Sequence, residues 1–206
     1  MRETRARGRR TGGGSGAALA LAALLLGGLP GPASALVGDL TADGIREAIE
    51  AGTAGITQDD FAEEWQLRTP GGEDIVVSTP FSRLALAART SAMKDEALTE
   101  KQQKEQIDRG KGRIQLLVTM HGGPSRSFAR FYQPTLLVNG REVKASFVQN
   151  ERTPLVQDDG RLAARNVYVF PLEGLPTTGV VTLVVRGAPP DQKEVLRATL
   201  DLGKFR

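Results

Sequence analysis

The sequence predicts an α+β protein, with N-terminal helices followed by a C-terminal antiparallel β-sandwich of immunoglobulin-like type and about seven short strands. Apolar residues recur at helical spacing before Gly112 and alternate at strand spacing from Arg113 onward. The Asn139-Gly140 pair, placed between two alternating runs, is typical of a tight hairpin. The alternative architecture is a single antiparallel sheet with a buried helix on one face.

The first 35 residues are typical of a secretory signal peptide. Five arginines precede an apolar run at residues 17–26, and helix breakers and an Ala33-Ser34-Ala35 triplet follow it. The run is shorter than the roughly 20 residues that a membrane-spanning helix needs, so we expect cleavage after Ala35 and no lasting membrane anchor. Arg9-Arg10 lacks the apolar residues that normally follow a twin-arginine pair, which favours the general export route. We therefore expect a periplasmic or secreted protein.

Cleavage would also change the charge of the chain. The leader holds five of the 27 basic residues and one of the 24 acidic ones, so the remainder has 22 basic and 23 acidic residues. This balance gives no reason to expect a nucleic-acid partner. The sequence contains no cysteine, so the exported protein depends on a packed core and not on disulfides. We expect a helical region at residues 36–112 and a β-domain at residues 113–206.

Two short helices are expected between residues 40 and 66. The first has Thr41 as its N-cap and Gly52 as a C-cap glycine. The second has a capping signal at Thr57, after which Phe61 and Trp65 lie one turn apart on the same side. These helices should fold as a pair over a larger body.

The stretch "STPFSRLALAART" at residues 78–90 predicts a third helix, directly after a short strand at residues 75–77. Thr79 is a good N-cap, and Pro80 suits the first helical position because its missing N–H costs nothing there. Apolar residues occupy most of the girth of this helix, which indicates burial on more than one side. We interpret it as core packing; the alternative is a groove for a lipid or peptide. A polar, solvated helix should follow, with a capping box at Thr99 and Gln102.

The β-domain is organised around the predicted Asn139-Gly140 hairpin. A two-residue turn fixes the register, so the expected facing pairs are Val138 with Arg141, Leu136 with Val143, Pro134 with Ala145 and Tyr132 with Phe147. Three further strands follow before the end of the chain, separated by turns rich in glycine, proline and aspartate.

Catalytic and metal chemistry finds little support in the sequence. His121 is the only histidine, and neither a cysteine nor a nucleophile-elbow motif accompanies it. These facts argue against a catalytic centre and against a zinc site, and we expect no cofactor. Asp158 and Asp159 precede a glycine in a good turn sequence, for which a weak cation site is the alternative interpretation.

One exposed patch is a candidate for binding a partner. Arg126 and Arg130 alternate with aromatic residues such as Phe128, a pattern that suits an anionic partner, although the plainer interpretation is a strand entry with anchoring aromatics. With the hairpin tip at Asn139 and Gly140, these residues form the predicted partner-binding site. We therefore predict a non-enzymatic binding or assembly module whose partner is another envelope protein. The alternatives are a carrier with a cavity lined by the helix at residues 80–92, and an enzyme centred on His121.

Overall fold

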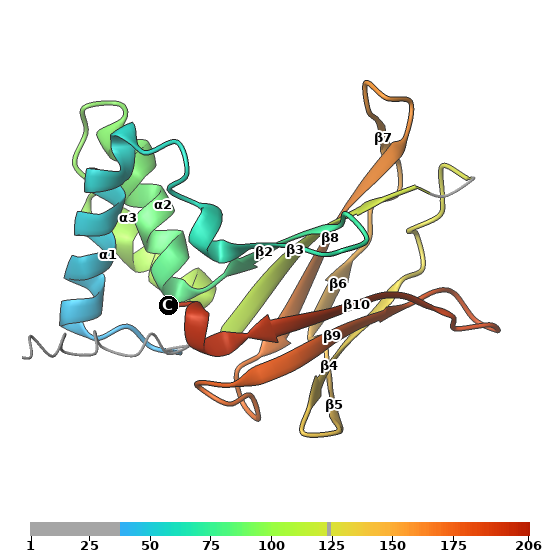
Figure 1. The fold of residues 1–206 in the computed structure, drawn as a ribbon. Coiled ribbons are helices and arrows are strands. Elements are labelled where there is room, and N and C mark those ends of the chain that lie inside the picture. The colour runs from blue at the N-terminus through green and yellow to red at the C-terminus, as the bar shows by residue number, and fades with distance from the viewer. Residues whose placement is uncertain (1–37, 123–124) are drawn as a thin grey trace, which may run out of the picture. The chain divides into compact units, whose positions relative to one another are not determined.

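The structure is a computed structural model that describes residues 38–122 and 125–206 (Figure 1). Three α-helices are present in this part of the chain: α1 (Ala42–Ala54), α2 (Pro80–Ala92) and α3 (Glu100–Gly110). The expected signal peptide and its cleavage point after Ala35 lie outside the described residues. Within those residues, every helix is too short or too polar to cross a membrane.

In these described residues, ten strands form two antiparallel sheets. They are β1 (Gln66–Arg68), β2 (Asp74–Ser78), β3 (Arg113–His121), β4 (Gln133–Val138), β5 (Arg141–Lys144), β6 (Phe147–Gln149), β7 (Leu155–Val156), β8 (Leu162–Pro171), β9 (Val180–Arg186) and β10 (Glu194–Asp201). Sheet A has the order β1-β2-β3-β8-β6, with β7 also paired to β8, and sheet B has the order β10-β9-β4-β5. The predicted α+β class is therefore confirmed, with more strands than the seven expected.

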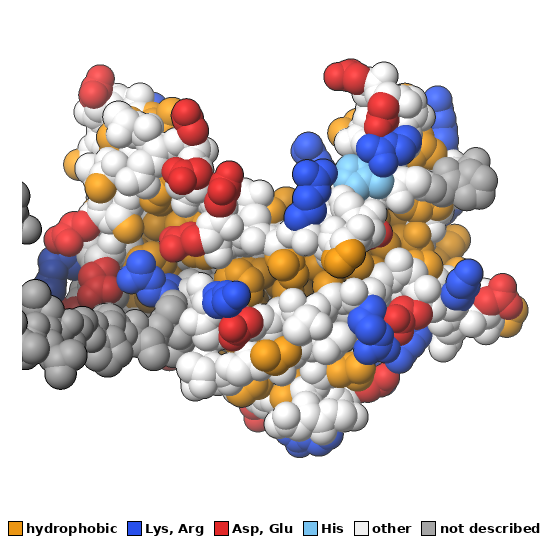
Figure 2. All heavy atoms as spheres, in the orientation of Figure 1, with side chains coloured by type: hydrophobic (Ala, Val, Ile, Leu, Met, Phe, Trp, Pro, Cys, Tyr) orange, Lys and Arg blue, Asp and Glu red, His pale blue; other side chains and the backbone are white. Residues whose placement is uncertain are grey.

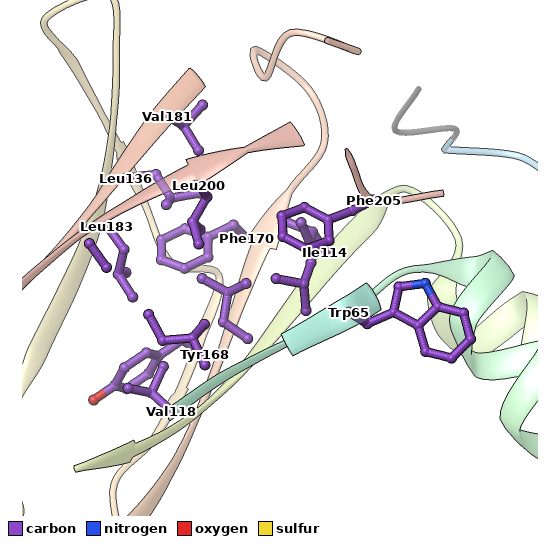
Figure 3. Close-up of a cluster of buried hydrophobic side chains, with 14 of the residues drawn as sticks. Trp65, Ile114, Val118, Leu136, Tyr168, Phe170, Val181, Leu183, Leu200 and Phe205 are labelled. Atoms are coloured by element: carbon purple, nitrogen blue, oxygen red, sulfur yellow. The ribbon is translucent and has the colours of Figure 1, made fainter. Parts of the chain in front are cut away.

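One hydrophobic core joins the two sheets and continues into the helices. Figure 3 shows its centre, where side chains of β3 and β8 face side chains of β4, β9 and β10. The same cluster includes Ala48 of α1 and Leu84 of α2. The immunoglobulin-like topology is not confirmed by this arrangement.

The expected N-terminal block of helices is wrong, because the helices lie mid-chain with strands between them. Strands β1 and β2 separate α1 from α2, and β2 pairs with β3 over five residues. The second expected helix does not form: the segment has short 3₁₀ turns at Gly55–Thr57 and Glu63–Trp65, and its last residues enter β1. Pairing of β1 with β2 satisfies backbone groups that a helix would have bonded internally.

Helix α2 confirms the interpretation of residues 78–90 as core packing. Thr79 caps the helix in a reciprocal capping box with Ser82, and Pro80 is its first residue. Its buried face packs against α1, where Gly52 permits close approach: a Cβ on Gly52 would lie 2.1 Å from the carbonyl oxygen of Ala85. Gly52 is thus a packing residue inside α1 and not the predicted C-cap, which is Gly55.

The predicted hairpin is confirmed near its turn and wrong beyond it. Leu136 faces Val143 and Val138 faces Arg141, as expected. The other two expected pairs do not form, because the chain leaves sheet B after Lys144 and Phe147 pairs with Val169 of sheet A. A strand that changes sheet needs only a few residues of irregular backbone. The change leaves the Phe147 side chain 52% exposed on sheet A.

Candidate functional site

The predicted patch at residues 125–132 forms a series of turns before β4. Arg126 and Arg130 are exposed, as expected, and the Arg130 guanidinium lies 5.3 Å from the ring centroid of Phe131. Phe128 is half-buried and meets the ring of Tyr132 edge to face, with centroids 6.2 Å apart. The aromatics thus serve partly as anchors, which matches the plainer interpretation of this segment.

The hairpin tip lies at the opposite end of β4 from that patch. Asn139 and Gly140 have φ of 49° and 80°, as a two-residue turn requires, and both are exposed. Because β4 has six residues, it separates the tip from Tyr132 by roughly 20 Å at about 3.3 Å per residue. The structure does not bring the two parts of the predicted binding site together.

His121 ends β3 beside a single carboxylate. Its Nε2 lies 3.8 Å from Oδ2 of Asp74, and both ring nitrogens are buried with no hydrogen-bond partner in the described part of the chain. Among the described residues, no group of three or more His, Cys, Asp or Glu side chains could hold a metal ion. Asp159, the alternative cation ligand, is instead bonded to Arg161, whose backbone and side-chain hydrogen bonds lower the pKa of this carboxyl.

A different group of residues, which we call the arginine cluster, combines Arg83 of α2, Arg109 of α3 and Arg113 of β3. Two packing contacts bring their elements together. Gly110 at the end of α3 lies against Pro80, where an added Cβ would be 3.0 Å from the Pro80 Cα. Strand β3 is held at the same place because Gln115 pairs with Ser78, the last residue of β2.

The positive charge of the arginine cluster is not neutralised within the described residues. None of the three guanidinium groups has a carboxylate within 4.0 Å there. Arg83 instead donates from Nη2 to Oε1 of Gln115 at 2.9 Å, and Arg113 donates from Nε to the carbonyl of Lys111 at 3.3 Å. Partial burial, followed by the neighbouring charges of Arg109 and Arg113, lowers the pKa of Arg83. Three cations therefore share one region with no carboxylate within 4.0 Å of their guanidinium groups in the described residues.

Two hollows flank the arginine cluster. The first, between α2 and α3, has a volume of about 470 Å³; Arg83 lines it together with apolar Leu86, Ala87 and Leu98. The second, also about 470 Å³, extends over the outer face of sheet A, where Arg113 is next to Phe147 and Val169. The arrangement provides cationic hydrogen-bond donors for an anion, with apolar side chains in the hollow on each side of the arginine cluster.

The other side chains of the first hollow are mainly polar. Lys94, Glu96, Gln102 and Gln106 line it, so only part of its wall is apolar. Figure 2 shows that one face of the described residues carries charged side chains of both signs, with hydrophobic side chains between them. The polar lining favours an extended polar ligand over a lipid chain.

Sequence reasoning missed the arginine cluster for a physical reason. Arg83 looks like a solvated break in an apolar helix, and Arg109 and Arg113 belong to a segment that looks like a wet surface. No local spacing links the three residues. Only the packing of α3 on α2 and the pairing of β2 with β3 bring them together, and neither can be derived from a local motif.

Comparison with known proteins adds little. No protein-family model and no curated protein matches the sequence. The chain is similar in part to a crystal structure of a novel protein of unknown function from Burkholderia pseudomallei K96243, with a TM-score of 0.39 and 10% sequence identity. That similarity covers 81% of this chain and 92% of the other. A likeness at this level supports no inference about function.

Proposed function

We propose that the protein is an exported, non-enzymatic binding or assembly module that docks an acidic segment of another envelope protein on the arginine cluster. The observation that carries the proposal is the convergence of three arginines from α2, α3 and β3 without a carboxylate within 4.0 Å in the described residues. In this proposal, the β-rich part is an immunoglobulin-like scaffold, and the leader at residues 1–35 directs export.

An anionic partner would relieve an unfavourable arrangement. Like charges on neighbouring side chains at a wet surface repel by roughly 0.5 to 2 kcal/mol, depending on their separation and on the local dielectric. A carboxylate among three guanidinium groups replaces this repulsion with attraction and accepts paired hydrogen bonds, for which the planar arginine fork is suited. Arg83 is already oriented by its bond to Gln115, so less side-chain entropy is lost on binding.

The flanking hollows suggest what lies next to the acidic residues of the partner. Leu86 is 37% exposed in one hollow and Phe147 is 52% exposed beside the other. An extended segment with one or more acidic residues and a neighbouring apolar side chain would fill both kinds of surface. We therefore propose a protein segment as the ligand and not a free small anion.

The other functions remain alternatives. A carrier would need a cavity lined by the helix at residues 80–92, and the hollow beside α2 has several polar and charged walls. An enzyme centred on His121 would need further reacting groups, and Asp74 is the only carboxylate found next to the imidazole among the described residues. The exposed patch at Arg126 and Arg130 is the competing binding surface.

The test compares two pairs of arginine variants. We would measure fluorescence anisotropy of a short labelled peptide rich in Glu and Leu as it is titrated with the processed protein. We expect the R83Q/R113Q variant to bind at least about tenfold more weakly than the unaltered protein, because two of the three cations are lost. Binding should also weaken between about 50 and 300 mM salt, as screening of exposed charges requires.

The matched control is R126Q/R130Q, which removes the same charge from the competing patch. It should bind the peptide as well as the unaltered protein does. A peptide with Gln in place of each Glu should bind neither the unaltered protein nor R126Q/R130Q. The proposal fails if R126Q/R130Q weakens binding while R83Q/R113Q leaves it unchanged. It also fails if the Gln peptide binds as tightly as the Glu peptide.

A further inference from the structure

Strand β10 is the longest free sheet edge in the part of the chain that the structure describes. It has eight residues and ends sheet B, whereas the other edge strands are β5 with four residues, β1 and β6 with three each, and β7 with two. Figure 1 shows β10 beside β9, and in the described residues β10 pairs with no other strand. A long free edge offers unpaired backbone groups to another strand.

The hydrogen-bond pattern of β10 identifies the groups that point outward. The amide of Leu202 donates to the carbonyl of Gly179 at 2.7 Å, directly across from it in the register of β9 and β10. Alternate residues of an antiparallel strand bond to the same neighbour, so the residues between these contacts bond to the other side. The N–H and C=O groups of Arg197, Thr199 and Asp201 therefore face the free edge. Strand β10 pairs only with β9 in the described residues, and no backbone hydrogen bond outside the strands involves these groups there.

We infer that β10 pairs antiparallel with β10 of a second copy of this chain, about a two-fold axis at Thr199. In this register, Thr199 faces its counterpart, and Arg197 of each copy faces Asp201 of the other. All three are residues whose backbone groups point outward, so each facing pair exchanges two hydrogen bonds. The four strands of sheet B in each copy then form one continuous sheet.

Charge complementarity selects this register over its neighbours. Moving the axis to Ala198 or Leu200 leaves Arg197 opposite a threonine or a glycine. Moving it to Arg197 or Asp201 places like charges directly opposite each other, which is destabilising. Only the axis at Thr199 pairs Arg197 with Asp201, and it does so twice, as an isologous interface requires.

Neighbouring side chains support the same pairing on both faces of the strand. Glu194 holds the Arg197 guanidinium on the outer face through bonds of 2.8 and 2.7 Å. A pairing with Asp201 of the second copy would extend this ion pair into a network. On the core side, Ala198 and Leu200 are buried and would face Leu200 and Ala198 of the other copy. The interface is thus apolar inside and charged outside.

Sedimentation velocity over a range of concentrations tests this inference on the processed protein. We expect a concentration-dependent dimer. The R197D variant should raise its Kd about tenfold, because Asp at position 197 of each copy would face Asp201 of the other, which gives two like-charge contacts in the dimer. D201R should weaken it similarly. The double variant R197D/D201R should restore dimerisation relative to both single variants, and circular dichroism checks that each variant is folded.

Hydrogen exchange provides a second measurement that needs no variant. The amides of Arg197, Thr199 and Asp201 should gain protection as the protein concentration rises, while those of Ala198 and Leu200 stay protected throughout. A monomer at every concentration up to about 100 µM would overturn the inference, since that corresponds to negligible affinity. A dimer that survives both single reversals would also overturn it. The β10 edge is separate from the arginine cluster, so neither result depends on the proposed function.

Discussion

Replacing Gly52 by Ala is expected to destabilise the protein, although alanine is the better helix former. Gly52 is buried inside α1, and an added Cβ would lie 2.1 Å from the Ala85 carbonyl oxygen and 2.9 Å from the Ala88 Cβ. The oxygen belongs to the backbone of α2, so α1 and α2 must separate to make room. Overpacking of this kind costs about 1 to 3 kcal/mol. The gain in helix propensity is about 1 kcal/mol.

We expect the cost to exceed the gain, because a contact of 2.1 Å requires the helices to shift and loosens the apolar packing around them. With the cost in the upper part of its range, the net loss is roughly 1 to 2 kcal/mol, which corresponds to a fall in Tm of about 2 to 8 °C for a chain of this size. Differential scanning calorimetry of the protein measures the change. The matched control is Gly44→Ala in the same helix, where the added Cβ would meet Leu40 and Thr41 at 3.5 Å, an ordinary contact. The control should be as stable as the unaltered protein or slightly more stable. A G52A variant at least as stable as the unaltered protein would refute this account of the α1 and α2 contact.

Two further predictions concern buried polar groups. Thr79 and Thr99 both cap helices through reciprocal capping boxes, but Thr79 is fully buried and also donates to the carbonyl of Arg206. In urea unfolding we expect Thr79→Val to cost about 2 kcal/mol, Thr99→Val about 1 kcal/mol, and Thr79→Ser little; equal losses at the two valine variants would contradict the role of burial. The chain has two tyrosines, and burial raises the pKa of both Tyr132 and Tyr168 above the ordinary value. Folded-state values above the unfolded one mean that stability is complete below about pH 10 and falls as pH rises further, because only the unfolded chain releases these protons there. We expect absorbance at the phenolate band to stay low past pH 10 until the protein unfolds, and Tyr168→Phe to reduce the alkaline loss of stability; ordinary titration of both tyrosines in the folded protein would contradict this.

Local chemistry in the sequence predicted local structure well. The N-caps at Thr41, Thr79 and Thr99 and the hairpin at Asn139-Gly140 are confirmed, because each depends on residues within a few positions of one another. The register of the first pairs between β4 and β5, next to the turn, also follows from the two-residue turn alone.

Long-range pairing decided the features that the sequence did not reveal. Gln66 to Arg68 form a strand because β2 is available as a partner, although Phe61 and Trp65 have helical spacing. Phe147 pairs with Val169, some 20 residues away, and so leaves the hairpin. The helices therefore lie among the strands and not before them. Such choices depend on which distant segments meet, and local propensity does not specify that.

The candidate site follows the same division. The sequence identified Arg126 and Arg130 because they are close together and next to aromatics. It did not identify Arg83, Arg109 and Arg113, which lie on three different elements, α2, α3 and β3. The cluster exists only because Gly110 packs on Pro80 and Gln115 pairs with Ser78. Sites assembled in this way require a three-dimensional structure.

The most direct test of the central claim is an NMR titration of the arginine side chains with the Glu and Leu peptide. The Nε–H resonances of Arg83, Arg109 and Arg113 should shift together as the peptide is added, with a common Kd, because the same carboxylates contact all three guanidinium groups. Those of Arg126 and Arg130 should stay in place. Shifts at Arg126 and Arg130 with none at the arginine cluster would contradict the claim.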